Sequence, residues 1–75
     1  MIMYMVEVKN VKNSDTNKIT YFQLVCGAWQ RISKAKYRRL TSHADWADSF
    51  STKIKGNKVH QYGAYYYNNL ADIEV

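Results

Sequence analysis

The first third of the chain alternates apolar and more polar positions with the period of a β-strand. One side of the first predicted strand is formed by Ile2, Tyr4, Val6 and Val8, and the other by Met3, Met5, Glu7 and Lys9. Residues 13–17 are short and polar, which is typical of a turn, and a second strand-like run extends from Ile19 to Cys26. Gly27 interrupts this run as a bulge or a close backbone approach, and residues 29–32 continue it. The pattern predicts an antiparallel hairpin with a loop of about five residues.

A short helix is predicted after Ser33, whose hydroxyl suits an N-cap because it can accept from a free amide of the first turn. The apolar stripe of this helix consists of Tyr37, Leu40, Ala44 and Ala47. The opposite side is basic and contains Lys34, Lys36, Arg38, Arg39 and His43. Like charges four residues apart cost a few tenths of a kcal/mol when unpaired, so the basic face is expected to have a use.

The last predicted hairpin turns at Gly56 and Asn57, where glycine in the first position favours a type II′ turn. This turn sets the expected pairs, which are Lys55 with Lys58, Ile54 with Val59, Lys53 with His60, Thr52 with Gln61 and Phe50 with Gly63. The ring of Phe50 would then cover Gly63 on the apolar face. The outer face is predicted to present Lys53, Lys55, Lys58, His60, Tyr62 and Tyr66.

The order of these elements predicts an α+β fold, ββαββ, in which one helix packs on an antiparallel sheet. The 75 residues allow a single domain, 1–75, with a flexible tail over residues 70–75 that is either a final edge strand or a segment docking on a partner. A core this small and the exposed edges of a four-stranded sheet favour a homodimer, formed by edge pairing or by packed sheet faces.

Composition narrows the class of protein. Hydrophobic residues make up 47% and aromatic residues 15% of the chain, which excludes a disordered polypeptide. No apolar run approaches the roughly 20 residues of a spanning helix, and the N-terminal residues lack the features of a signal peptide, so no membrane partner is predicted. A single cysteine allows no internal disulfide, which fits a reducing compartment and a cytoplasmic location.

The sequence contains no pattern typical of a catalytic or metal-binding site. Cys26, His43 and His60 are far apart and lie on different predicted elements, so neither a metal nor another cofactor is predicted. Cys26 is expected to be a small buried hydrophobe within a strand. Asp45 and Asp48 are more simply explained as marking the helix end than as an acid/base pair. The protein is therefore predicted not to be an enzyme, and a Cys26→Ser substitution is expected to be tolerated.

Basic residues interleaved with aromatic residues are the feature most relevant to function. The net charge is +5, and five of the cations lie between Arg31 and Arg39. This clustering either attracts an acidic partner or simply forms a solvated face. The chain has seven tyrosines, more than the core of one sheet needs, which favours a binding surface over packing alone. The candidate binding residues, for protein or nucleic acid, are Trp29, Arg31, Lys34, Arg38, Arg39, Lys53, Lys58, His60, Tyr62 and Tyr66.

Residues 27–37, GAWQRISKAKY, are similar to a segment of small uncharacterised accessory proteins encoded by bacteriophages. The shared core is an R-I-S-K stretch before a tyrosine, and His60-Gln61-Tyr62 matches a later strand that contains histidine and tyrosine. In such proteins an acid is common where this chain has Lys36. The resemblance implies a phage setting in the bacterial cytoplasm, where small proteins of the anti-CRISPR and anti-restriction type inhibit host factors by binding them.

Two binding functions follow as hypotheses. The first is a non-enzymatic phage protein that binds and inhibits a host nucleic-acid-handling or defence protein, or a nucleoprotein complex, through Arg31, Lys34, Arg38, Arg39 and neighbouring aromatic residues. The alternative is direct binding of single-stranded nucleic acid through the basic, tyrosine-rich face of the last hairpin.

Overall fold

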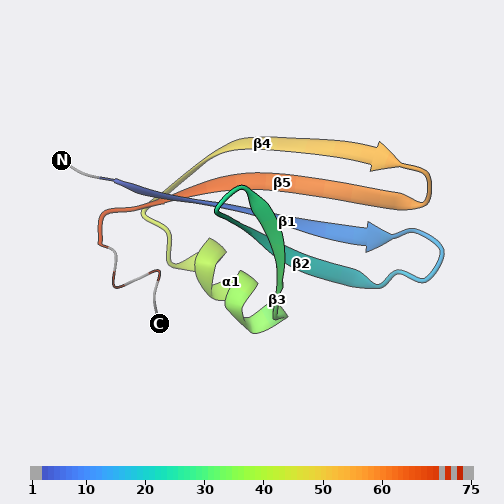
Figure 1. Cartoon of the computed structure of the whole chain (residues 1–75), viewed down its shortest axis with the longest axis horizontal. Helices are drawn as coiled ribbons and strands as arrows, with labels where there is room; N and C mark the ends of the chain where they lie inside the picture. The colour runs from blue at the N-terminus through green and yellow to red at the C-terminus, as the bar shows by residue number, and fades with distance from the viewer. Residues whose placement is uncertain (1–2, 70, 72, 74–75) are drawn as a thin grey trace.

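The computed structural model describes residues 3–69, 71 and 73, and it contains five strands and one helix (Figure 1). All paired strands are antiparallel and form one sheet in the order β3-β2-β1-β5-β4. The elements are β1 (Tyr4–Asn13), β2 (Ile19–Val25), β3 (Ala28–Ile32), α1 (Lys34–Ser42), β4 (Trp46–Lys55) and β5 (Lys58–Tyr67). The first and last hairpins are joined by β1 and β5, which lie side by side in the middle of the sheet.

The predicted ββαββ fold with one helix packed on the sheet is wrong, because the domain is dominated by its five-stranded sheet. Strands account for 61% of the structure and helix for 14%. The additional strand arises because the chain reverses at Cys26 and Gly27, where a bulge or a close backbone approach within a continuing strand was expected. Both residues adopt left-handed backbone conformations, with φ of 50° and 79°, as a type I′ hairpin turn requires.

The helix is also shorter than its apolar stripe predicts. Ser33 caps it as expected, since its side-chain oxygen accepts from the amide of Lys36 at 3.1 Å. The helix ends at Ser42, and Ala47 lies in β4 instead. The chain returns to the sheet at Asp45, whose amide donates to the carbonyl of Tyr66 at 2.9 Å. The spacing of Ala47 from Ala44 fits a further helical turn, but apolar spacing alone does not distinguish such a turn from the start of a strand.

Both predicted hairpins are present. In the loop after β1, the side chain of Asn13 accepts hydrogen bonds from the amides of Asp15 and Thr16, which stabilises the turn. In the second hairpin the four pairs nearest the turn match the expected register. Gly56 has φ of 59° and Asn57 does not have a positive φ, as a type II′ turn requires.

The fifth predicted pair, Phe50 with Gly63, is displaced by a bulge between Asp48 and Ser51. The expected contact nevertheless forms, because the Cε1 atom of Phe50 lies 3.0 Å from the position that a Cβ on Gly63 would occupy.

The two hairpin tips are joined by hydrogen bonds. The amide and the hydroxyl of Ser14 both donate to the carbonyl of Asn57, each at 2.8 Å. The side chain of Asn57 donates to the Oδ2 atom of Asp15 at 3.0 Å. These contacts hold the loop after β1 beside the turn between β4 and β5, at the end of the sheet that projects beyond the helix (Figure 1).

The core lies between α1 and one face of the sheet. It consists of Val6, Val8, Leu40 and Tyr67, and the hydroxyl of Tyr67 donates to the carbonyl of Leu40. Because the helix has only nine residues, it covers only one end of this face (Figure 1). No helix of the described residues lies on the opposite face of the sheet. The predicted tail falls largely outside the described residues, but Ile73 packs against the core. Among the described residues, no helix is long and apolar enough to cross a membrane.

Candidate functional site

The face of the sheet opposite the helix carries most of the predicted binding residues, and we call it the open face. Val8 of β1 points into the core, so its neighbour Lys9 points to the open face. Lys9 pairs with Phe22 on one side and with Tyr62 on the other, and cross-strand partners share a face. The same alternation places the following residues there: Val11, Leu24, Trp29, Arg31, Trp46, Lys53, Lys55, Lys58, His60 and Tyr66.

At the centre of the open face, one lysine is surrounded by three aromatic rings. The Nζ atom of Lys9 lies 4.7 Å from the ring centroid of Trp29 and 5.4 Å from those of Phe22 and Tyr62. We call these four residues the central cluster. An ammonium group over an aromatic ring is attracted by the negative face of that ring, so the cluster orders the long lysine side chain.

Trp29 and Tyr62 meet although two strands separate them. Their centroids are 5.8 Å apart with the rings at 57°, whereas β3 and β5 are three strand spacings apart in the sheet, about 14 Å. The two side chains must therefore lean toward each other over Lys9. The two rings form an aromatic surface next to the ammonium group of Lys9. The side chain of Trp29 in this surface is 36% exposed.

Tyr62 extends this surface toward β4. The imidazole of His60 stacks on Tyr62, with centroids 6.1 Å apart and an angle of 15° between the rings. The Nζ atom of Lys53 lies 5.7 Å from the Tyr62 centroid. A second aromatic pair, Trp46 with Tyr66, has centroids 4.8 Å apart at the other end of β4 and β5.

The surroundings of His60 disfavour the charged form of its imidazole. Desolvation lowers the pKa of its imidazole below the ordinary value, and the positive charges of Lys9, Lys55 and Lys58 lower the pKa further. Its Nδ1 atom is buried and has no hydrogen-bond partner among the residues that the structure describes.

Charge is unevenly distributed over the open face. The lysines concentrate toward the hairpin tips, where Lys53 faces His60 and Lys55 faces Lys58. At the opposite end, Glu7 and Asp48 both pair with Ala64 and bring negative charge. The face is therefore basic over the central cluster and the tips, and mixed in charge beyond them.

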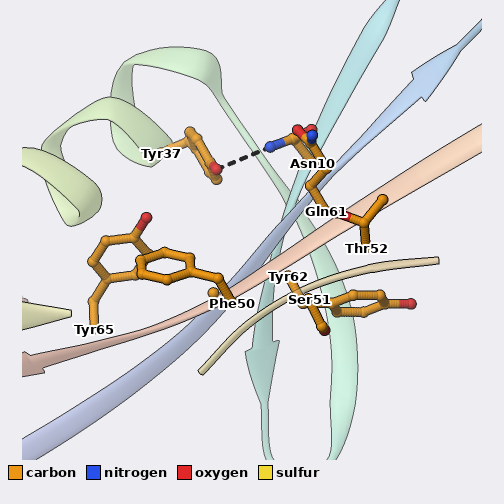
Figure 2. Close-up of a pocket in the computed structure, with 9 residues that line it drawn as sticks. Asn10, Tyr37, Phe50, Ser51, Thr52, Gln61, Tyr62 and Tyr65 are labelled. Atoms are coloured by element: carbon orange, nitrogen blue, oxygen red, sulfur yellow. Dashed lines mark hydrogen bonds between the residues drawn. The ribbon is translucent and has the colours of Figure 1, made fainter. Parts of the chain in front are cut away.

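On the helix side of the sheet, a hollow of about 500 Å³ opens between α1 and the strands β4 and β5 (Figure 2). The Nδ2 atom of Asn10 donates to the hydroxyl of Tyr37 at 3.1 Å, and the rings of Phe50 and Tyr65 meet edge to face at 5.9 Å. Burial, and then the neighbouring Tyr37, raise the pKa of Tyr65. No charged side chain lines this hollow, so it has no cation to neutralise a phosphate.

The structure separates the candidate binding residues into two groups. The open face brings together Trp29, Arg31, Lys53, Lys58, His60, Tyr62 and Tyr66. The remaining three, Lys34, Arg38 and Arg39, belong to α1 and lie on the helix side of the sheet. They line a shallow hollow together with His43, and no acidic residue is among its lining.

Sequence reasoning missed Lys9 and Phe22 as members of the site. The alternation along β1 already placed Lys9 on the side away from the core, and the hairpin register would have placed Phe22 beside it. The position of Trp29 over Lys9 had no signal in the sequence, because it depends on β3 being a separate strand.

Cys26 and the potential metal ligands lie apart in the part of the chain that the structure describes. The expectation that Cys26 is buried within a strand is wrong, since it is exposed in the turn between β2 and β3. Among residues 3–69, 71 and 73, no group of three or more His, Cys, Asp or Glu could hold a metal ion.

Comparison with known proteins adds no family to this description: no family model, no curated protein and no solved structure matches the chain. Functional inference therefore depends on the geometry of the open face and the helix.

Proposed function

We propose that this protein is a non-enzymatic module that binds single-stranded nucleic acid through its open face. The observation that supports this function is the central cluster, in which Trp29 and Tyr62 lie over Lys9 on a sheet face that α1, the one helix of the described residues, does not cover. Bases stack on such rings with about 1–3 kcal/mol each, and neighbouring lysines neutralise the phosphates between them.

The arrangement suits single strands better than duplexes. An aromatic ring on a sheet can stack only on a base that is already unstacked from its neighbours. Duplex readers usually insert a helix or a β-ribbon into a groove. The open face instead offers rings and lysines side by side, which matches the alternating bases and phosphates of one strand.

The proposal is tested by titrating a labelled single-stranded oligonucleotide at several salt concentrations. If four cations of the open face contact phosphates, log affinity should fall against log salt with a slope of about −3. Lys53→Ala should reduce that slope by about 0.7, because it removes one contact. Lys34→Ala, which removes the same charge from α1, is the matched control and should leave the slope unchanged. Absence of binding at low salt would refute the proposal.

A second candidate function has support from the helix. Lys34 and Arg38 of α1 are exposed, Arg39 is half-buried, and no acid lines the hollow that they form. Together with the phage-type accessory role that we propose from the pattern of residues 27–37, this favours binding to an acidic surface of a host nucleic-acid-handling or defence protein in the cytoplasm.

Affinity capture from host lysate, with and without nuclease, separates the two functions. Capture of a protein that survives nuclease and is lost in the Arg38→Ala, Arg39→Ala double variant would favour the helix. Capture that nuclease abolishes and that depends on Trp29 would favour the open face.

A further inference from the structure

A second feature of the open face lies directly beside the central cluster. It is a hollow of about 450 Å³ above Val11, the next residue of β1 on this face after Lys9. In the ladder Val11 pairs with Thr20 on one side and with His60 on the other, so these residues flank the floor. The loop after β1 and the turn before β5 close the far end, where Lys18 and Lys58 line the hollow.

The lining combines an apolar floor with a basic rim. Val11 and the ring of Phe22 form the floor, while Lys9, Lys18 and Lys58 supply three cations from three different segments. No acidic residue lines the hollow, and Thr16 and Thr20 add hydroxyl groups. A ligand that fits must have both a flat or apolar part and an anionic part. The volume is within the range of small-molecule sites and suits a ligand as small as one nucleotide.

We propose that this hollow is a subsite for one nucleotide unit, whose phosphate is bound between Lys9, Lys18 and Lys58 while its base lies against Val11 and Phe22. The inference rests on the proposed single-strand function and specifies it further. Lys9 belongs to both the hollow and the central cluster, so a strand whose phosphate occupies the hollow continues with its next base on Trp29 or Tyr62.

His60 connects the subsite to pH. Its imidazole lines the hollow and stacks on the ring of Tyr62. The charged groups that face it are all cationic, namely Lys9 from β1, Lys58 from β5, and Lys53 and Lys55 from β4. A phosphate placed among these lysines offsets their charge and so favours the protonated imidazole. Ligand binding should therefore raise the pKa of His60, and by reciprocity affinity should increase as pH falls through this transition.

The test uses the full chain and follows the His60 ring protons by NMR during titration with adenosine 5′-monophosphate, with adenosine and with inorganic phosphate. We expect the monophosphate to shift the Val11 and His60 signals and to raise the pKa of His60. Adenosine, which has no phosphate, should leave that pKa unchanged. Inorganic phosphate should bind at least about tenfold more weakly than the monophosphate, because it lacks the base. Equal binding of the two anions would overturn the nucleotide assignment.

Variants then locate the phosphate. The Lys18→Ala, Lys58→Ala double variant should weaken the monophosphate about tenfold, since it removes two charged contacts at exposed positions. Lys34→Ala, Lys36→Ala is the matched control, because it removes the same charge from α1 and should have no effect. Equal losses in both variants would show that only net charge matters and would refute the subsite.

Failure of the subsite and failure of the proposed function give different results. If an oligonucleotide binds in a Trp29-dependent manner but the monophosphate leaves His60 unchanged, the subsite is refuted and the function stands. If the monophosphate binds as expected and the oligonucleotide does not bind, the hollow is a mononucleotide site and the single-strand function is refuted.

Discussion

Replacement of Trp29 by alanine tests the central cluster most directly. In the free protein Trp29 contacts Lys9, with 4.7 Å between Nζ and the ring centroid, and Tyr62, with 5.8 Å between centroids. A partly exposed cation–π contact contributes about 0.5–1 kcal/mol and an aromatic pair about 0.5–1.5 kcal/mol. Trp29→Ala should therefore reduce the free energy of unfolding by about 1–2.5 kcal/mol.

The effect on binding should be separate and of similar size. Loss of one stacking surface should reduce the binding free energy by about 1–3 kcal/mol, which weakens the affinity for a single-stranded oligonucleotide by roughly 5- to 150-fold. Because a ring carries no charge, the salt dependence should stay the same. Trp29→Phe keeps a ring over Lys9 and should retain most of the affinity.

Fluorescence anisotropy of a labelled oligonucleotide measures the affinity, and urea unfolding shows that the variant is folded at the temperature used. Phe50→Ala is the control, since Phe50 is 64% exposed but lies on the helix side of the sheet. If folded Trp29→Ala binds within about twofold of the parent, or if Phe50→Ala weakens binding equally, the assignment of the open face is refuted.

Three further predictions concern stability and are checked by chemical or thermal unfolding. Leu40→Ala should lower the free energy of unfolding by about 2–5 kcal/mol, because Leu40 is 1% exposed and is the only fully buried helix residue among those described. A decrease of less than about 1 kcal/mol would contradict this account of the core. Gly63→Ala should destabilise the sheet by about 1 kcal/mol, since the added Cβ would lie 3.0 Å from Phe50 and 3.1 Å from Tyr65, and Phe50→Ala should relieve part of that cost. The pKa of His60 is lowered in the folded state, so the imidazole of the unfolded chain is protonated first as pH falls below about 6.5. The free energy of unfolding should therefore decrease as pH falls through this range. His60→Gln, which removes the titrating group, should make this decrease smaller.

The local parts of the fold could be predicted from the sequence because neighbouring residues specify them. Gly56 and Asn57 define a turn whose geometry sets the register of the last hairpin, and four of the five expected pairs form. Ser33 predicted the start of the helix because a hydroxyl next to free amides is a local device. The alternation along β1 likewise placed Val6 and Val8 on one side of the strand, and both are buried.

The turn at Cys26 and Gly27 was missed for an equally local reason. A type I′ turn favours asparagine, aspartate or glycine at its first central position, and cysteine gives no such indication. Without that turn, residues 28–32 appear to continue the preceding strand. The count of strands, and with it the fold class, was therefore wrong.

Only the tertiary structure decided which residues form the candidate site. Alternation along the chain was enough to assign the two sides of β1 and of the last hairpin, but not those of β3, which was missed as a strand. The pairing of β1 with β5, from Tyr4 with Tyr67 to Asn13 with Lys58, places Lys9 between the two hairpins. That pairing joins segments about fifty residues apart, and its free energy depends on core packing and on closing a long loop, neither of which a local pattern records.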